Sequence, residues 1–99
     1  MIRGTTPTLE FIIPFDTSLL AEAYVTLSQQ GSVVLDKALE DCNCNENRLS
    51  VRLTQEETLK LKCDCITEIQ IRARTLSGDA IASNIIRECA ERILKDGVI

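Results

Sequence analysis

The sequence predicts an all-β fold, an antiparallel sandwich or small barrel. Several short segments alternate apolar and polar residues, which is typical of strands with one buried face. Turn-forming residues separate these segments at intervals that suit six or seven short strands. The chain has 99 residues, 44% of them hydrophobic, enough for one modest core. We therefore expect a single domain over residues 1–99.

The first half contains one predicted strand and one predicted hairpin. Residues 8–13 alternate, and Pro14 ends this strand because proline donates no hydrogen bond to a sheet. Residues 20–29 and 33–39 form the two arms of the hairpin. Gly31 lies in the loop between them and is expected to adopt a positive φ.

The middle of the chain is expected to contain a loop, a strand and one helical turn. Residues 40–47 are polar and rich in asparagine, which indicates a loop, and residues 48–53 alternate as a strand. Thr54 and Glu57 have the spacing of a capping box, in which each side chain bonds the other residue's backbone N–H. The apolar stretch that follows is short, so we expect a single turn at 55–58.

The last part of the chain begins with the clearest strand. Residues 66–75 alternate most strongly, and a turn follows at Leu76-Ser77-Gly78-Asp79. Residues 80–95 fit two structures. In a helix, their apolar residues would recur every four positions along one face. Their content of Ala, Arg and Glu, which are good helix formers, slightly favours the helix. As a strand, residues 80–87 would return antiparallel to 66–75.

Composition excludes several classes of function. Eleven Lys and Arg against fifteen Asp and Glu give a net charge of −4, which disfavours general binding to nucleic acid or anionic membranes. The chain has no histidine, so imidazole catalysis and His-ligated metals are excluded. Phe11, Phe15 and Tyr24 are the only aromatic residues, too few to stack bases. We expect no nucleic-acid and no membrane partner.

The amino-terminal residues do not have the pattern of a targeting segment. Residues 1–14 contain one basic residue, Arg3, and a short apolar run at 11–13, unlike a signal peptide. No stretch approaches the roughly 18 apolar residues of a membrane-spanning helix. We expect a soluble protein made in a cytoplasm, where cysteines are thiols. The five cysteines also fit poorly with a complete set of disulfides.

Four of the cysteines stand in two pairs, Cys42 with Cys44 and Cys63 with Cys65. Four thiolates could hold a tetrahedral zinc ion, so a small zinc-stabilised adaptor domain is the alternative function. The Cys-x-Cys spacing differs from the Cys-x-x-Cys turn of structural zinc sites. Cys63 and Cys65 share the parity of the apolar positions in 69–73, and we expect them to be small buried side chains. No metal is assigned.

The acidic residues do not form a recognisable catalytic or calcium pattern. Glu40 and Asp41 are adjacent, as are Glu56 and Glu57, so their carboxylates point apart into solvent. Residues 41–52 lack the central glycine and the final glutamate of a calcium loop. We expect no enzymatic activity and no cofactor.

Several motifs together resemble a known group of proteins. They are Met1-Ile2-Arg3-Gly4-Thr5-Thr6-Pro7-Thr8, Pro14-Phe15-Asp16, Leu53-Thr54-Gln55-Glu56-Glu57-Thr58, Ile69-Gln70-Ile71-Arg72, Gly78-Asp79-Ala80-Ile81-Ala82-Ser83-Asn84-Ile85, and Leu94-Lys95-Asp96-Gly97-Val98-Ile99. Their order and spacing over nearly the whole chain resemble small prophage-encoded immunoglobulin-like proteins of Firmicutes. The pattern is more distantly similar to the amino-terminal domain of phage baseplate upper proteins. The cysteine pairs are not part of it.

The resemblance implies an immunoglobulin-like antiparallel β-sandwich with one short helical turn. It places residues 80–89 in a strand, with Ser83-Asn84-Ile85 on that strand. It implies a non-enzymatic structural or assembly protein of a phage virion, tail or baseplate, made in the bacterial cytoplasm and then virion-associated. We expect it to contact other virion or tail proteins and to form a homo-oligomer.

Two groups of residues are the predicted interface. One is an extended amino-terminal arm, residues 1–8, with Arg3, Thr5 and Pro7 as contact residues; Gly4 and Pro7 suit a segment that a neighbour orders. The other is an exposed strand face, since Gln70, Arg72 and Arg74 share one parity of the predicted strand at 66–75. Cross-strand ion pairs with nearby glutamates are the competing role for these arginines.

Overall fold

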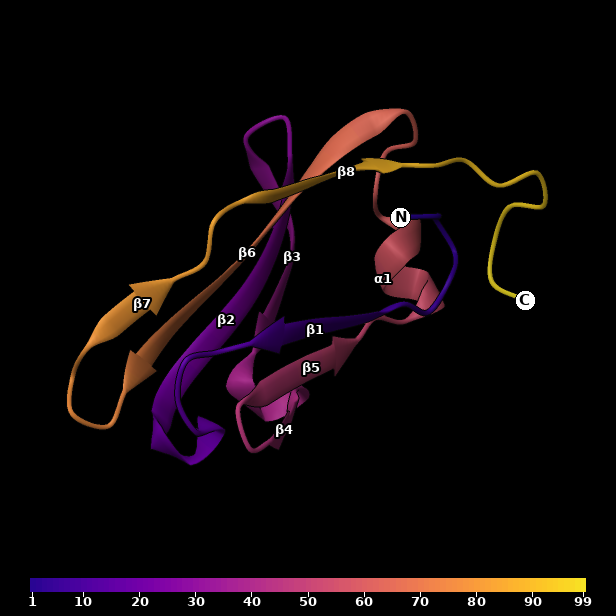
Figure 1. Ribbon diagram of the computed structural model, residues 1–99. Coiled ribbons are helices and arrows are strands. Elements are labelled where there is room, and N and C mark those ends of the chain that lie inside the picture. Colours follow the sequence, from indigo (N-terminus) through magenta and orange to yellow (C-terminus); the bar gives the residue numbers. More distant parts are fainter.

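The computed structural model describes residues 1–99 and consists of two antiparallel β-sheets packed face to face (Figure 1). The larger sheet has the order β3-β2-β6-β7, with β8 also paired to β6, and the smaller sheet has the order β1-β5-β4. The strands are β1 (Thr8–Ile12), β2 (Leu20–Gln29), β3 (Ser32–Ala38), β4 (Asn43–Asn45), β5 (Arg48–Arg52), β6 (Cys65–Thr75), β7 (Ala80–Ala82) and β8 (Ile86–Ala90). The predicted all-β sandwich is confirmed.

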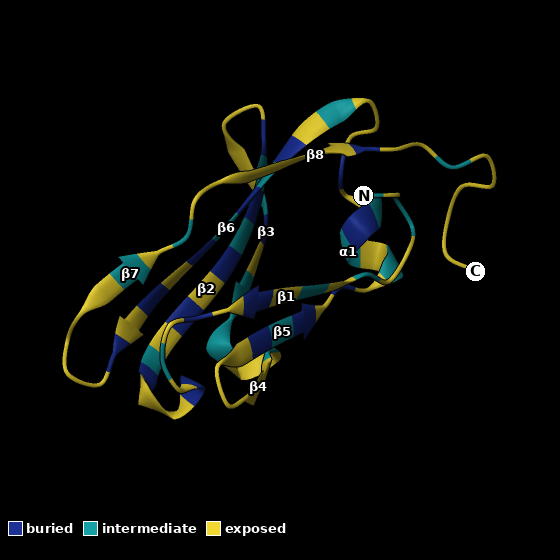
Figure 2. Cartoon of the chain, in the orientation of Figure 1, coloured by how far each residue is buried: buried dark blue, intermediate teal, exposed yellow.

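The hydrophobic core lies between the two sheets and uses one face of each. Val25 and Leu27 of the larger sheet and Leu49 and Val51 of the smaller sheet are almost completely buried. Buried and exposed residues alternate along β2 and β6 (Figure 2), as the sequence predicts for strands with one covered face.

The hairpin of β2 and β3 turns through two residues. Gln30 and Gly31 both have positive φ, 52° and 79°, which is the backbone of the tight turns that match the twist of paired strands. The predicted positive φ at Gly31 is confirmed. Gln29 is the last residue of β2, in agreement with the predicted arm at 20–29.

The predicted helical turn is α1 (Gln55–Leu59), and its capping box is complete. The Glu57 N–H donates to the Thr54 hydroxyl at 3.2 Å, and the Thr54 N–H donates to the Glu57 carboxylate at 2.9 Å. Two short 3-10 helices, η1 (Thr17–Leu19) and η2 (Leu39–Asp41), complete the elements. None of these helices has the length and apolar character needed to cross a membrane.

The predicted loop at 40–47 is partly wrong. The end of η2 is followed there by β4, which pairs with β5 through a turn in which Glu46 has a φ of 53°. All three residues of β4 are exposed, so no apolar alternation marks this strand in the sequence.

The continuous strand predicted at 80–89 is broken in two, β7 and β8, and the helical alternative for 80–95 is wrong. Both strands pair antiparallel with β6, but the register shifts by one residue between them, so Ser83-Asn84-Ile85 lies in the break and not on a strand. Ser83 bridges the break because its N–H donates to the Ile71 carbonyl at 2.9 Å and its hydroxyl accepts from the Ile71 N–H at 3.1 Å. The one-residue insertion has the effect of a β-bulge.

Candidate interaction surface

The outer face of the larger sheet brings together the exposed strand residues that the sequence predicts. Tyr24 of β2 lies directly opposite Arg72 of β6. Next to them, Glu22 and Arg74 form an ion pair at 3.6 Å. These side chains line a shallow hollow of about 410 Å³ on the solvent side of the sheet. An exposed tyrosine beside an arginine is a combination enriched at protein interfaces.

The predicted residues of this face differ in how far they are free to bind a partner. Gln70 donates its amide to the Ser83 carbonyl at 2.9 Å, so it supports the break between β7 and β8. Arg74 is paired with Glu22, the competing role expected for these arginines. Arg72 makes no ion pair within the chain, and Tyr24 is 43% exposed. Arg72 and Tyr24 are therefore the two side chains of this face that are most available.

The amino-terminal residues lie along the body of the protein. Arg3 donates from its guanidinium to the carbonyls of Leu61 at 2.7 Å and Leu59 at 2.9 Å, next to the end of α1. Its backbone N–H donates to the Glu91 carbonyl at 3.1 Å, beside the carboxyl end of β8. The buried Thr58 hydroxyl donates to the Thr5 carbonyl at 2.9 Å.

Residues 1–8 are thus ordered by their own chain. The Leu53 N–H donates to the Pro7 carbonyl at 2.9 Å and continues the β1–β5 pairing beyond Thr8. Gly4 has a φ of 72°, and an added Cβ there would approach Ile93 Cδ1 to 2.9 Å. A partner that binds the predicted contact residues Arg3, Thr5 and Pro7 must recognise this docked conformation.

Among the edge strands of the two sheets, β1 and β7 present open edges on either side of one hollow. Two hydrogen bonds show which β1 residues pair with β5: the Leu53 N–H donates to the Pro7 carbonyl, and the Ile13 N–H donates to the Asn47 carbonyl. Hydrogen-bonded and free residues alternate along an antiparallel strand, so the N–H and C=O groups of Thr8, Glu10 and Ile12 point away from β5. The same alternation leaves Ala80 and Ala82 of β7 with free backbone groups. Between these edges lies a hollow of about 470 Å³ whose apolar lining includes Phe11 and Ile81.

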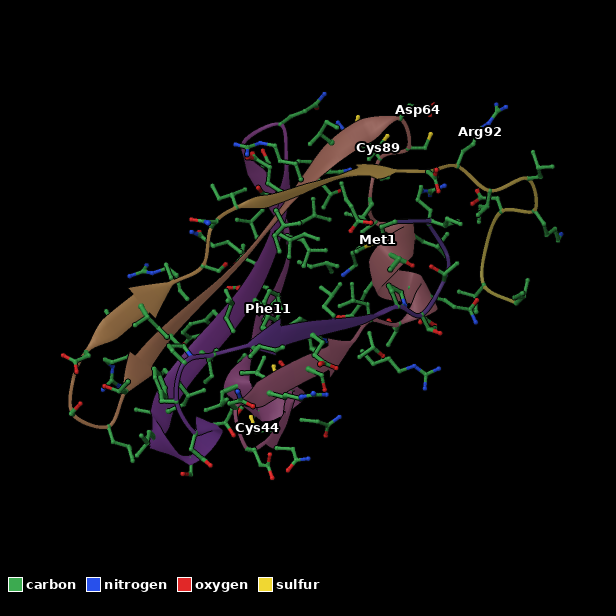
Figure 3. All side chains as sticks on the ribbon, in the orientation of Figure 1. Met1, Phe11, Cys44, Asp64, Cys89 and Arg92 are labelled. Carbon is green, nitrogen blue, oxygen red and sulfur yellow. The ribbon has the colours of Figure 1, made fainter.

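The cysteines do not converge. Cys44 pairs with Leu49 in the smaller sheet, whereas Cys65 pairs with Ala90 in the larger sheet. Figure 3 shows Cys44 and Cys89 at opposite sides of the molecule. The chain contains no group of three or more Cys, Asp or Glu side chains placed to hold a metal ion.

The predicted burial of the second pair is wrong for Cys63, which is exposed in the turn before β6; Cys65 is half-buried. Asp64 has a positive φ of 60°, which interrupts the alternation of side chains that would have placed Cys63 on the core face. Burial, with smaller contributions from the neighbouring Cys44 and Asp41, raises the pKa of Cys42 to about 11. Cys42 is therefore a protonated, unreactive thiol at neutral pH.

One partly buried ion pair joins α1 to the edge of the larger sheet. Lys37 Nζ of β3 lies 2.6 Å from a Glu57 carboxylate oxygen, and both side chains are less than one-fifth exposed. The hydrogen bond from Lys37 to Glu57 raises the pKa of Lys37. Burial acts to raise the pKa of Glu57, but the hydrogen bonds from Lys37 and Thr54 outweigh it and hold that pKa below its ordinary value.

Replacing Glu57 with glutamine is expected to lower the free energy of unfolding by about 1–2 kcal/mol at pH 7, because the ammonium of Lys37 loses its charged partner. The folded-state pKa of Glu57 is depressed, so its contribution is present above the ordinary value of 4.5 and is lost as pH falls below it. Urea unfolding at pH 7 and pH 3 measures the free energy of unfolding of wild type and Glu57→Gln. The difference in this free energy between the two proteins should shrink at pH 3, whereas the exposed control Glu56→Gln should differ little from wild type at either pH.

An apolar hollow lies at one end of the sandwich, and no motif in the sequence indicates it. Phe15, Leu19, Leu76 and Ile81 are its apolar residues, and its volume is about 580 Å³. We name these four residues the basal hollow. Phe15 and Leu76 fall in turn segments, where alternation carries no information, so only their apolar character in polar surroundings could have marked them.

Comparison with protein-family models, with curated proteins and with solved structures gave no match for this chain.

Proposed function

We propose that this protein is a non-enzymatic structural or assembly component of a phage or prophage particle that acts through protein–protein contacts. The open edges of β1 and β7 carry the proposal. The edges of β1 and β7 face an apolar hollow between the sheets, and such an edge pairs with another strand unless it is blocked.

The resemblance of the sequence to prophage-encoded immunoglobulin-like proteins supports the particle as the site of action. The exposed pair Tyr24 and Arg72 on the outer sheet face offers a second contact surface to another virion or tail protein. The thiols give no comparable support to a zinc-stabilised adaptor, because Cys44 and Cys65 lie in different sheets.

The test is incorporation into particles. Induced phage particles from a strain that encodes the protein should be purified by density gradient and probed for it by immunoblot. We expect the wild-type chain to sediment with the particles. Recovery of the protein only from the soluble fraction of the lysate, with particles intact, would contradict the proposal.

A variant at the β1 edge tests the mode of contact. Glu10→Pro removes an outward-pointing N–H and leaves the β1–β5 hydrogen bonds in place, so it should reduce incorporation severalfold while the circular dichroism spectrum stays unchanged. Glu10→Ala is the matched control, because it removes the ion pair with Arg48 but keeps the N–H. Equal loss in both variants would assign the effect to charge and not to the strand edge.

A further inference from the structure

The smaller sheet leaves part of the inner face of the larger sheet uncovered. The larger sheet continues past β6 with β7, whereas the smaller sheet ends at β1, the strand of that sheet nearest to β7 in Figure 1. Ile81 of β7 lies beside Ala73 of β6 and packs against the core. Both residues line the hollow of about 470 Å³, together with Phe11 and Ile13 of β1. We call it the edge hollow; a further strand beside β1 would cover it.

The backbone of β1 matches the backbone of such a strand. Thr8, Glu10 and Ile12 each direct an N–H and a C=O away from β5, and β5 is the one strand that pairs with β1. These groups recur at every second residue, which is the spacing that another extended backbone satisfies. The five residues of β1 give an edge of about 17 Å. The occupant that fits this edge is therefore an extended polypeptide segment.

The two faces of β1 determine which side chains the segment carries. Side chains beside Phe11 would point into the edge hollow toward Ile81 and Ala73, so apolar residues are required at alternate positions. On the outer face, the segment would lie beside Glu10, whose side chain is half exposed. An acidic residue directly opposite Glu10 is unfavourable and a basic residue is favourable. The arginines of β5 lie on the far side of Glu10, one strand further from this edge.

This chain has no free segment of its own for that position. Its segments with alternating apolar residues already pair within the two sheets. The amino-terminal residues are held by the hydrogen bonds of Arg3 to Leu59 and Leu61. The carboxyl end is held by those of Gln55 to Ile99. A second copy therefore has no unpaired strand to donate, and the segment belongs to a different polypeptide.

We propose that β1 receives an antiparallel strand from a different polypeptide, whose alternate apolar side chains fill the edge hollow and whose outer face carries a basic residue opposite Glu10. This inference rests on the proposed assembly role and names the chemistry of the partner. The antiparallel direction is that of every strand pair in the two sheets. One added strand buries less than the roughly 1,200 Å² of a standard interface, so a single segment binds weakly and reversibly.

The test is a titration of the isotope-labelled full chain, followed by NMR. The probe is acetyl-Val-Thr-Val-Lys-Val-Thr-Val-amide with N-methyl groups on its two central valines, which keep it from stacking into sheets. Its threonine and lysine N–H groups remain free to pair with β1. We expect saturable shifts at the amides of Thr8, Glu10 and Ile12, and none along β3. The same peptide methylated at the lysine and threonine nitrogens instead is the matched control and should not bind.

Variants of the chain test the backbone and charge contributions. Glu10→Pro should bind the probe up to about tenfold more weakly than Glu10→Ala, because it also lacks the outward N–H. Replacing the lysine of the probe with glutamate should weaken binding to wild type up to about fivefold. This preference should disappear in Glu10→Ala.

A charge placed in the edge hollow tests the apolar contribution. Ile81→Asp should abolish binding of the probe. If circular dichroism shows that this variant is unfolded, Ile81→Ala replaces it and should weaken binding severalfold. Val33→Asp on β3, at a position 64% exposed, is the control and should bind like wild type.

Several outcomes overturn the inference. A wild-type chain that shows no shifts at millimolar probe does so, as do shifts confined to other strands, or equal binding of the two methylated peptides. Shifts at the β1 amides that grow with protein concentration alone would assign this edge to a second copy and also overturn it. Particle incorporation without binding of the probe removes this inference and leaves the proposed function standing, whereas binding without incorporation does the reverse.

Discussion

Replacing Leu27 with alanine is expected to lower the free energy of unfolding by about 3 kcal/mol. Leu27 is completely buried toward the carboxyl end of β2, opposite Leu35 of β3 and Ile69 of β6. Hydrogen-bonded strands on both sides hold the backbone in place, so the surroundings cannot collapse into the space that the side chain leaves. Urea unfolding followed by circular dichroism should show a lower midpoint with an unchanged slope.

The matched control for this change is Leu76→Ala, the same substitution at an exposed position of the β6–β7 turn. It should alter the free energy of unfolding by no more than about 0.5 kcal/mol. Equal effects of the two substitutions would mean that Leu27 does not lie in the core between the sheets.

Alternation predicts a strand only when one of its faces is covered. It located β1, β2, β5 and β6, whose inward residues are buried in the common core. It could not locate β4, because Asn43, Cys44 and Asn45 are all exposed and the strand is held by backbone hydrogen bonds to β5. Backbone pairing of this kind leaves no mark on the pattern of side chains.

The alternation of apolar and polar residues also could not predict the break between β7 and β8. Ile86, Arg87, Glu88 and Cys89 of β8 are all exposed, so a shift of one residue in register does not change which side chains are covered. The hydrogen bonds of Ser83 to Ile71 decide where the strand breaks, and they depend on a residue far away in the sequence.

Alternation along the strand predicted that Gln70, Arg72 and Arg74 share one face, but it did not show which residues they contact. Arg72 and Arg74 are both exposed on the outer face, yet only Arg74 has a glutamate within reach. The choice of partner follows from the pairing of β2 with β6, which sets Glu22 opposite Arg74 and Tyr24 opposite Arg72. Alternation restricts that register to one parity but does not choose among the registers that keep it.

Gln29 is the residue whose role differs most from its appearance in the sequence. It ends the arm predicted at 20–29, next to the turn residues Gln30 and Gly31, and its side chain has no apolar character that would mark it as buried. In the folded chain it is 4% exposed, and its amide accepts from the Lys62 N–H at 2.8 Å and donates to the Lys62 carbonyl at 3.0 Å. The same amide lies 3.2 Å from the Thr67 hydroxyl, so one side chain joins the β2–β3 turn to the segment that leads into β6.

Replacing Gln29 with alanine is therefore expected to lower the free energy of unfolding by about 2–4 kcal/mol, because the backbone groups of Lys62 lose their partner inside the protein. Gln29→Glu separates hydrogen bonding from packing. A buried carboxylate facing the Lys62 carbonyl is unfavourable, so the folded-state pKa of this glutamate is raised and stability is lost as pH rises above about 4.3. Urea unfolding at pH 4 and pH 7 should show this loss for Gln29→Glu, while Gln30→Glu, the same substitution at the exposed neighbouring position, should show no comparable loss. A Gln29→Glu chain whose stability relative to wild type does not depend on pH would show that the amide is solvated, and the link between the hairpin and β6 would then rest on the backbone pairing alone.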